Sequence, residues 1–231
     1  MDKKTQLDFI HRFIPPNKIS GARTREKVTR EKTVFTTLLL LHGTGGNEDE
    51  MIHLGQQIAP EAAILSPRGK VLENGMPRFF RRLAEGVFDM EDLKFRTYEL
   101  ADFVEEASKV YGFDLRHIVA LGYSNGANIA ASELLLRPAI LSSAVLFRPM
   151  VPLIPEVLPD LSTKHVFISA GLHDPIVPGQ QTQNLFNLLK KAGVTDISIN
   201  WQKSGHELIL EEIRKARDWL LSVLSFNEKN I

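Results

Sequence analysis

Short, continuously apolar runs alternate along this chain with longer segments in which apolar residues recur every three or four positions. Continuous apolar runs are typical of strands in a parallel sheet that is covered on both faces, and the longer spacing is typical of amphipathic helices. The alternation predicts an α/β fold with a mostly parallel central sheet and helices on both faces. Strands are expected at residues 37–41, 62–66, 117–123, 143–147, 165–170 and 196–201.

Helices are predicted between these strands and after the last one. The segment 97–111 places its apolar residues on one face and stops at Gly112, because glycine commonly terminates a helix. A short helix is expected to carry His53. The remaining helices are expected directly after Ser124, over residues 179–192 and over residues 209–224.

Three segments depart from this alternation. Residues 7–14 predict an antiparallel edge strand that ends at Pro15 and Pro16, because proline cannot donate a hydrogen bond within a sheet. Residues 17–32 are rich in lysine and arginine and predict an exposed basic loop. Residues 75–92 mix aromatic residues with arginines and follow neither pattern.

Composition and charge narrow the class of protein. The 231 residues suit one α/β domain that spans the chain, and no linker divides them. Lys+Arg and Asp+Glu both number 28, so the chain has no net positive charge that would favour binding to nucleic acid. The absence of cysteine excludes disulfides and thiolate catalysis. With no visible signal peptide, and no apolar run near the roughly 20 residues of a membrane helix, we expect a cytoplasmic protein without a membrane span.

A candidate nucleophile lies in the sequence ALGYSNGANIA. Ser124 is flanked by Gly122 and Gly126, after an apolar predicted strand and before an alanine-rich predicted helix. A sharp strand-to-helix turn exposes a serine above a sheet, and the two glycines permit a turn that a Cβ would obstruct. A serine hydroxyl becomes a strong nucleophile when a base removes its proton and a carboxylate orients that base.

An acid and a base follow Ser124 in the chain order that this arrangement requires. Asp174 and His206 each come directly after a predicted strand, which places both at the carboxyl ends of strands, where open α/β sheets form their sites. We therefore predict a catalytic triad of Ser124, Asp174 and His206. Four other downstream candidates open a strand, precede one or lie beside the acid: Asp160, Asp196, His165 and His173.

The glycine-rich loop HGTGGNE supplies expected donors for the oxyanion that forms when a carbonyl is attacked. The backbone N–H of Thr44 is the first expected donor, and that of Asn125, the residue after the nucleophile, is the second. Loops of this kind also cradle phosphates, but the sequence fits neither common phosphate-loop pattern. His42, at the start of the loop, is expected to shape the loop without a chemical role.

Candidate substrate contacts come from the segment 75–92 and from residues 150–153. Apolar side chains in these segments either line a small pocket or cover the edge of the sheet: Met76, Phe79, Phe88 and Met150. Arg78, Arg81 and Arg82 either meet a substrate carboxylate or are solvated and salt-bridged, and the sequence leaves both open. Because no HExxH or comparable pairing occurs, neither a metal nor a cofactor is expected.

A family resemblance rests on four motifs in order, LLLLHGTGGNE, ALGYSNGANIA, GLHDPIVP and SGHEL. Together they resemble the carboxylesterase, phospholipase and acyl-protein thioesterase family of α/β-hydrolases over residues 35–222. The stretch LSPRGKVLENGMPRFFRRLAEGVFD is similar to a bacterial subgroup of hydrolases linked to hydroquinone and catechol stress. The resemblance implies an α/β-hydrolase fold, the same triad, Thr44 in the oxyanion hole and self-association as a homodimer. The basic loop at residues 17–32 is longer than this family leads us to expect.

These observations predict a serine hydrolase that cleaves small aryl or short-chain acyl esters through an acyl-enzyme intermediate. No long insertion is present to build a large lid, which favours a small pocket. The expected partner is a small-molecule ester, and no nucleic-acid partner is expected. Two alternatives stay open, a thioesterase or lysophospholipase for longer acyl chains and a non-catalytic ligand-binding protein on the same fold.

Overall fold

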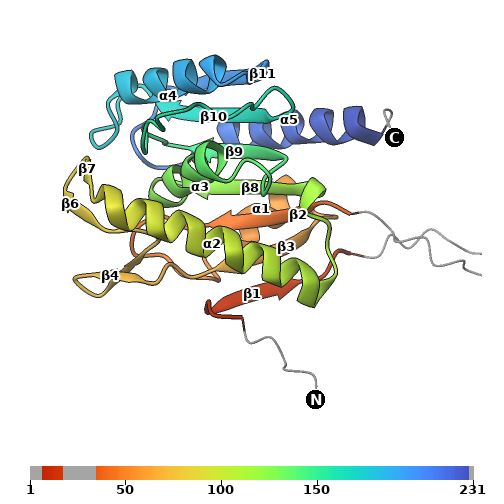
Figure 1. Ribbon diagram of the computed structural model, residues 1–231. Helices are drawn as coiled ribbons and strands as arrows, with labels where there is room; N and C mark the ends of the chain where they lie inside the picture. The colour runs from red at the N-terminus through yellow and green to blue at the C-terminus, as the bar shows by residue number, and fades with distance from the viewer. Residues whose placement is uncertain (1–6, 18–34, 229–231) are drawn as a thin grey trace, which may run out of the picture.

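The computed structural model describes residues 7–17 and 35–228, and Figure 1 shows a central sheet between two layers of helices. The sheet has seven strands in the order β1-β3-β2-β8-β9-β10-β11. β1 pairs antiparallel with β3, and every other neighbouring pair is parallel. The strands are β1 (His11–Ile14), β2 (Thr37–Leu41), β3 (Ala63–Pro67), β8 (Ile118–Tyr123), β9 (Ser143–Phe147), β10 (His165–Gly171) and β11 (Asp196–Gln202).

Helices cover both faces of this sheet, and each face carries its own apolar cluster. One cluster lies under α2, α3 and α4, and the other lies under α1 and α5. The predicted α/β fold is therefore confirmed. The helices are α1 (Ile52–Ile58), α2 (Met90–Tyr111), α3 (Asn125–Leu136), α4 (Gly179–Lys191) and α5 (Leu210–Glu228).

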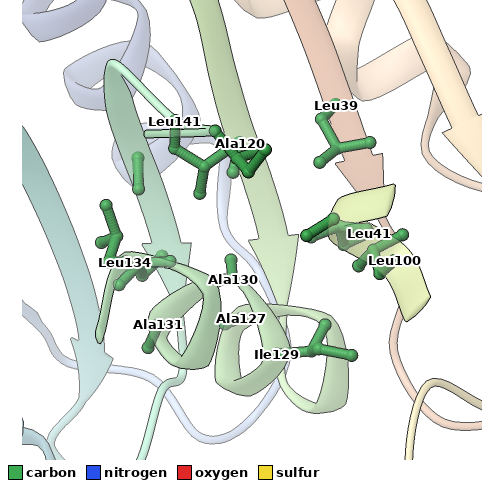
Figure 2. Close-up of a cluster of buried hydrophobic side chains, with 14 of the residues drawn as sticks. Leu39, Leu41, Leu100, Ala120, Ala127, Ile129, Ala130, Ala131, Leu134 and Leu141 are labelled. Atoms are coloured by element: carbon green, nitrogen blue, oxygen red, sulfur yellow. The ribbon is translucent and has the colours of Figure 1, made fainter. Parts of the chain in front are cut away.

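The continuously apolar strands serve both clusters at once. In β2, Leu39 and Leu41 belong to the cluster under α3, whereas Leu38 and Leu40 belong to the opposite cluster. Successive side chains of a strand point to opposite faces, so a strand covered on both sides is apolar at every position. Figure 2 shows Leu41 near the small alanines of α3, which allow this helix to lie close to the sheet, and Leu39 farther along β2.

The segment that followed neither sequence pattern forms two hairpins. The first pairs β4 (Val71–Glu73) with β5 (Met76–Arg78), and the second pairs β6 (Arg82–Ala84) with β7 (Val87–Phe88). Asn74 and Gly75 both have positive φ, 52° and 80°, at the first turn. Asn-Gly is the strongest short hairpin signal, so the sequence contained the evidence for this turn.

The helix α2 begins at Met90, seven residues before the predicted start. Asp89 caps it, because its side chain accepts a hydrogen bond from the amide of Asp92 at 3.1 Å. Leu93 is the one buried residue before Thr97, so apolar spacing alone could not detect the first turns. The other predicted strands and helices are confirmed to within a few residues at their ends.

The predicted basic loop at residues 17–32 lies outside the described residues except for Asn17. Within the described part of the chain, each connection between sheet strands holds at most one α-helix, so no large lid domain is inserted there. A search of the described helices finds none with the length and apolar character of a membrane span.

Candidate active site

Ser124 occupies a strained turn between β8 and α3 at the carboxyl edge of the sheet. Its backbone has φ 51° and ψ −111°, a conformation that few residues other than glycine adopt. The Ser124 amide donates to the carbonyl of Phe147 at 2.9 Å, which ties the turn to the end of β9. A Cβ on Gly122 would lie 2.6 Å from the carbonyl oxygen of Gly126, so this turn requires glycine there.

The three residues of the predicted triad meet at this edge although they are far apart in sequence. His206 Nε2 lies 3.0 Å from Ser124 Oγ, and His206 Nδ1 lies 2.8 Å from Asp174 Oδ2. The second oxygen of Asp174 accepts from the amides of Ile176 and Val177, at 2.8 and 2.9 Å. The fixed carboxylate therefore favours the imidazole tautomer with a proton on Nδ1, which leaves Nε2 free to accept the serine proton.

The loop that carries His206 is held by Tyr123, the residue before Ser124. The Tyr123 hydroxyl donates to the main-chain carbonyl of His206 at 3.0 Å, and the two rings lie 5.4 Å apart. Burial raises the pKa of Tyr123 above its usual value, so the phenol keeps the proton that this bond needs. The serine turn and the histidine loop are thus joined directly.

Arg148 contacts the residues of the predicted triad and their loops, and the sequence analysis did not identify it. Its side chain is fully buried, and its Nε lies 3.9 Å from Asp174 Oδ2. An arginine directly after the apolar strand β9, at the same edge as the other site residues, was the signal that could have identified it. Its guanidinium donates to the carbonyls of Gly205 (3.1 Å) and Glu207 (2.6 Å), to Ser204 Oγ (3.1 Å) and to the Glu212 carboxylate (2.7 and 2.8 Å).

The two predicted oxyanion donors adjoin Ser124. Thr44 and Asn125 line the same cleft as the serine. Asn125 is the first residue of α3, where a helical amide has no acceptor within the helix. The loop that carries Thr44 is attached to β5, because the Gly45 amide donates a hydrogen bond to the carbonyl of Pro77 at 2.9 Å. The assignment of the Thr44 and Asn125 amides as oxyanion donors stays a prediction.

His42 is fixed in the wall of the oxyanion loop. It is 1% exposed; its Nδ1 donates to Gly43 O at 2.6 Å, and its Nε2 accepts from the Gly69 amide at 3.0 Å. Burial lowers the pKa of His42, which keeps the ring neutral, as a group that donates at one nitrogen and accepts at the other must be. These contacts agree with the predicted shaping role.

Ser124 opens into a solvent-connected cleft. Of the four predicted pocket residues, Phe88 and Met150 line it, but Met76 and Phe79 do not. Phe79 is 2% exposed and packs against His42 at 4.7 Å between ring centroids, so it belongs to the core. The full lining is Thr44, Arg78, Arg82, Glu85, Gly86, Phe88, Ser124, Asn125, Asn128, Met150, Ile176 and Val177.

The three candidate arginines separate into two groups. Arg78 and Arg82 line the cleft, where both contact Glu73, at 3.2 and 2.8 Å. Arg81 lies outside the cleft and pairs with Asp89 at 2.7 Å on the surface. In residues 7–17 and 35–228, no three or more His, Asp or Glu side chains gather as metal ligands would.

Comparisons with known proteins agree with this geometry. The phospholipase/carboxylesterase family model matches residues 24–224. MhqD of Bacillus subtilis (strain 168), which is named as a hydrolase, is 50% identical over 187 residues, covering 81% of this chain and 93% of MhqD. The crystal structure of the Bacillus cereus carboxylesterase superposes with a TM-score of 0.83 at 47% identity, over 92% of this chain and 93% of that one.

A third relative, YahD, was solved with malic acid. It superposes with a TM-score of 0.81 at 32% identity, over 93% of this chain and 98% of YahD. The family model alone covers most of the chain, and these relatives share its fold along nearly their whole length. The protein is therefore a hydrolytic enzyme that belongs to the phospholipase/carboxylesterase family of α/β-hydrolases.

Proposed function

We propose that this protein is a serine carboxylesterase that cleaves small esters through an acyl-enzyme intermediate. The observation that carries the proposal is the pair of contacts of His206, which lies 3.0 Å from Ser124 Oγ and 2.8 Å from Asp174 Oδ2. A serine, a base and an orienting acid in contact, beside a cleft lined by the two expected oxyanion donors, are the parts that acyl transfer to water requires.

In the first half of the reaction, Ser124 Oγ attacks the ester carbonyl carbon while His206 Nε2 takes the hydroxyl proton. The carbonyl π electrons move to the oxygen, whose negative charge is stabilised by the amides of Thr44 and Asn125. Asp174 stabilises the imidazolium without taking its proton. The tetrahedral intermediate then collapses, the bond to the alcohol oxygen breaks, and His206 protonates that oxygen. The alcohol leaves, and the acyl group stays on Ser124.

In the second half, a water molecule repeats the attack. His206 removes one proton from the water as its oxygen adds to the acyl carbon, and the same two amides stabilise the new oxyanion. Collapse breaks the bond to Ser124 Oγ, which recovers its proton from His206. The products are the carboxylic acid and the free enzyme.

The cleft supports a small substrate. Of the twelve residues that line it, seven are polar or charged and four have apolar side chains, which suits a compact ester better than a long acyl chain. The relative YahD, solved with a small dicarboxylic acid, agrees with this size. The expected substrates are aryl esters and short-chain acyl esters. The homodimer and the cytoplasmic location expected from the sequence remain predictions.

The test is turnover of 4-nitrophenyl acetate by the wild type and by Ser124→Ala. We expect the variant to lose at least about 10³-fold in kcat, because the nucleophile is absent. Ser222→Ala, at an exposed serine of α5, is the matched control and should keep the wild-type rate. Equal rates for the wild type and Ser124→Ala would refute the proposal and favour a ligand-binding protein.

A series of 4-nitrophenyl esters of increasing acyl length tests the substrate class separately. The value of kcat/KM should be highest for the short members, since the cleft holds few apolar side chains. A steady rise towards long chains would contradict the small-pocket proposal and favour the thioesterase or lysophospholipase alternative.

A further inference from the structure

Two arginines in the wall of the cleft share a single carboxylate. Glu73 Oε2 lies 3.2 Å from Arg78 Nε, and Glu73 Oε1 lies 2.8 Å from Arg82 Nη2. These residues come from the two hairpins, with Glu73 on β4, Arg78 on β5 and Arg82 on β6. One acid therefore faces two guanidinium groups beside Ser124.

The charges in this wall do not balance. Arginine stays protonated at neutral pH, and the neighbouring Arg82 guanidinium holds the pKa of Glu73 below its usual value, so all three groups are charged. One positive charge is left over. Glu85, also in the lining, is exposed and forms no ion pair with any described residue, so solvent weakens the effect of its negative charge on the two arginines without removing it.

Both arginines keep hydrogen-bond donors that the protein does not use. Arg78 is 3% exposed and donates through Nε to Phe80 O and through Nη1 to Thr44 Oγ1, at 3.2 and 2.6 Å. Arg82 contacts Glu73 through Nε and Nη2. Within the described ranges, Arg78 Nη2 and Arg82 Nη1 have no protein acceptor, and both side chains line the cleft.

We propose that Arg78 and Arg82 bind a carboxylate on the substrate, so that the preferred substrates of this enzyme are anionic esters. The proposal deepens the proposed function and rests on it, because it needs Ser124 to act on the ester in the same cleft. A guanidinium binds a carboxylate through paired N–H groups, and such charged hydrogen bonds are stronger than neutral ones.

Arg78 also contacts a residue of the predicted oxyanion hole, which links carboxylate binding to the attack on the ester. Its Nη1 holds the side chain of Thr44, whose backbone amide is an expected oxyanion donor. A carboxylate at the arginines would therefore be fixed relative to the oxyanion hole, and the carbonyl to be attacked would be fixed with it. A neutral ester of the same size lacks this second point of attachment.

The test compares two pairs of esters, and in each pair one member carries a free carboxylate that the other carries as its methyl ester; release of the phenol is measured for both. Mono-4-nitrophenyl adipate and its methyl-capped diester place the charge on the acyl side. 4-Acetoxybenzoate and its methyl ester place it on the leaving group. In at least one pair we expect the wild type to show about tenfold or greater kcat/KM for the anion, the gain typical of a charged hydrogen bond. The pair that shows it identifies the side of the substrate that carries the charge.

Two substitutions and one control locate the effect. Arg82→Gln should reduce the anion-to-neutral ratio towards one, whereas Glu85→Gln, which removes the nearby negative charge, should raise it. Arg81→Gln is the matched control, because Arg81 lies outside the cleft and pairs with Asp89, and it should keep the wild-type ratio. Both esters of a pair are measured on the same preparation, so a loss of folded protein cancels in the ratio.

The outcomes separate this proposal from the proposed function. If the wild type hydrolyses neutral and anionic esters equally, or if Arg82→Gln keeps the preference, the anionic-substrate proposal is wrong while the serine esterase stands. If Ser124→Ala hydrolyses both esters as fast as the wild type, the proposed function itself is wrong.

Discussion

The two buried arginines of this site, Arg148 and Arg78, differ in how their donors are used. Arg148 is completely buried, and every nitrogen of its guanidinium contacts a protein acceptor, among them the carboxylate of Glu212. Arg78 is almost as buried, but it shares Glu73 with Arg82 and leaves Nη2 unused among the described residues.

This difference indicates that the two arginines have different roles. A buried charge is tolerated when its partners replace the water that it has lost. Arg148 meets that condition entirely within the protein and joins the loops of Asp174 and His206 to α5. Arg78 meets it only in part, which suits a group whose remaining partner is a ligand. Substitution of Arg148 should therefore lower mainly the stability of the protein and its reaction rate. Substitution of an arginine in the cleft wall should change mainly the preference among substrates.

The largest expected effect comes from Arg148→Met. Removal of one partner leaves the Glu212 carboxylate buried and unpaired, so unfolding should require about 3–5 kcal/mol less free energy. The loop that carries His206 also loses hydrogen bonds at Gly205 and Glu207, and kcat/KM should fall about hundredfold in the protein that still folds. Urea unfolding and 4-nitrophenyl acetate turnover measure the two quantities.

A double variant separates the two effects of Arg148. Arg148→Met combined with Glu212→Leu removes both charges, so most of the lost stability should return, because a buried ion pair can be replaced by apolar residues. The rate should stay low, since the loop contacts are still missing. Recovery of both stability and rate would show that Arg148 does not position the triad.

A third buried ionisable group, Glu133 on α3, differs from both arginines. Both of its carboxylate oxygens lack a hydrogen-bond partner among the described residues, and burial raises its pKa to about 8, with Arg137 opposing the shift. Between about pH 5 and pH 8 the folded protein keeps a proton that the unfolded chain releases, so this group makes stability fall as pH rises.

Glu133→Gln should remove that fall. The variant should gain about 3 kcal/mol relative to the wild type between pH 5 and pH 8, which urea unfolding at the two values measures. Glu106→Gln, at an exposed position of α2, is the control and should leave the pH dependence unchanged. A pH dependence that Glu133→Gln shares with the wild type would show that Glu133 is not protonated in the folded protein.

The smallest expected effect on stability comes from Arg78→Met. Glu73 keeps Arg82 as its partner, so the variant loses only hydrogen bonds, and unfolding should require about 1 kcal/mol less free energy. The same urea experiment measures it beside Arg148→Met. Equal losses for the two variants would remove the distinction between a structural and a ligand-facing arginine.

Sequence reasoning identified the parts of the site that lie at strand ends. Ser124, Asp174 and His206 each follow a strand whose apolar run is unmistakable, and the structure brings their side chains into contact. The parallel sheet explains why these residues meet, because strands with one direction bring the residues that follow them to one edge. Asn125 and Thr44 followed from the same placement.

The substrate wall was less predictable because it depends on pairing between short hairpins. Phe79 follows Arg78 directly, yet it turns into the core against His42 while the arginine faces the cleft. Strands of two or three residues are too short to show a periodic pattern, so the sequence does not reveal which side chains face the core and which face the cleft. Arg148 was missed for another reason, since the hydrogen-bond partners of its side chain lie more than fifty residues away in the sequence.

The central claim, that Ser124 is the nucleophile of this hydrolase, is tested most directly by a fluorophosphonate label followed by mass mapping of the modified peptide. The reagent captures a serine that a neighbouring base has activated, as the 3.0 Å contact with His206 implies for Ser124. We expect a single adduct on Ser124 and no labelling of Ser124→Ala. An adduct on any other residue, or an unlabelled wild type, would contradict the account.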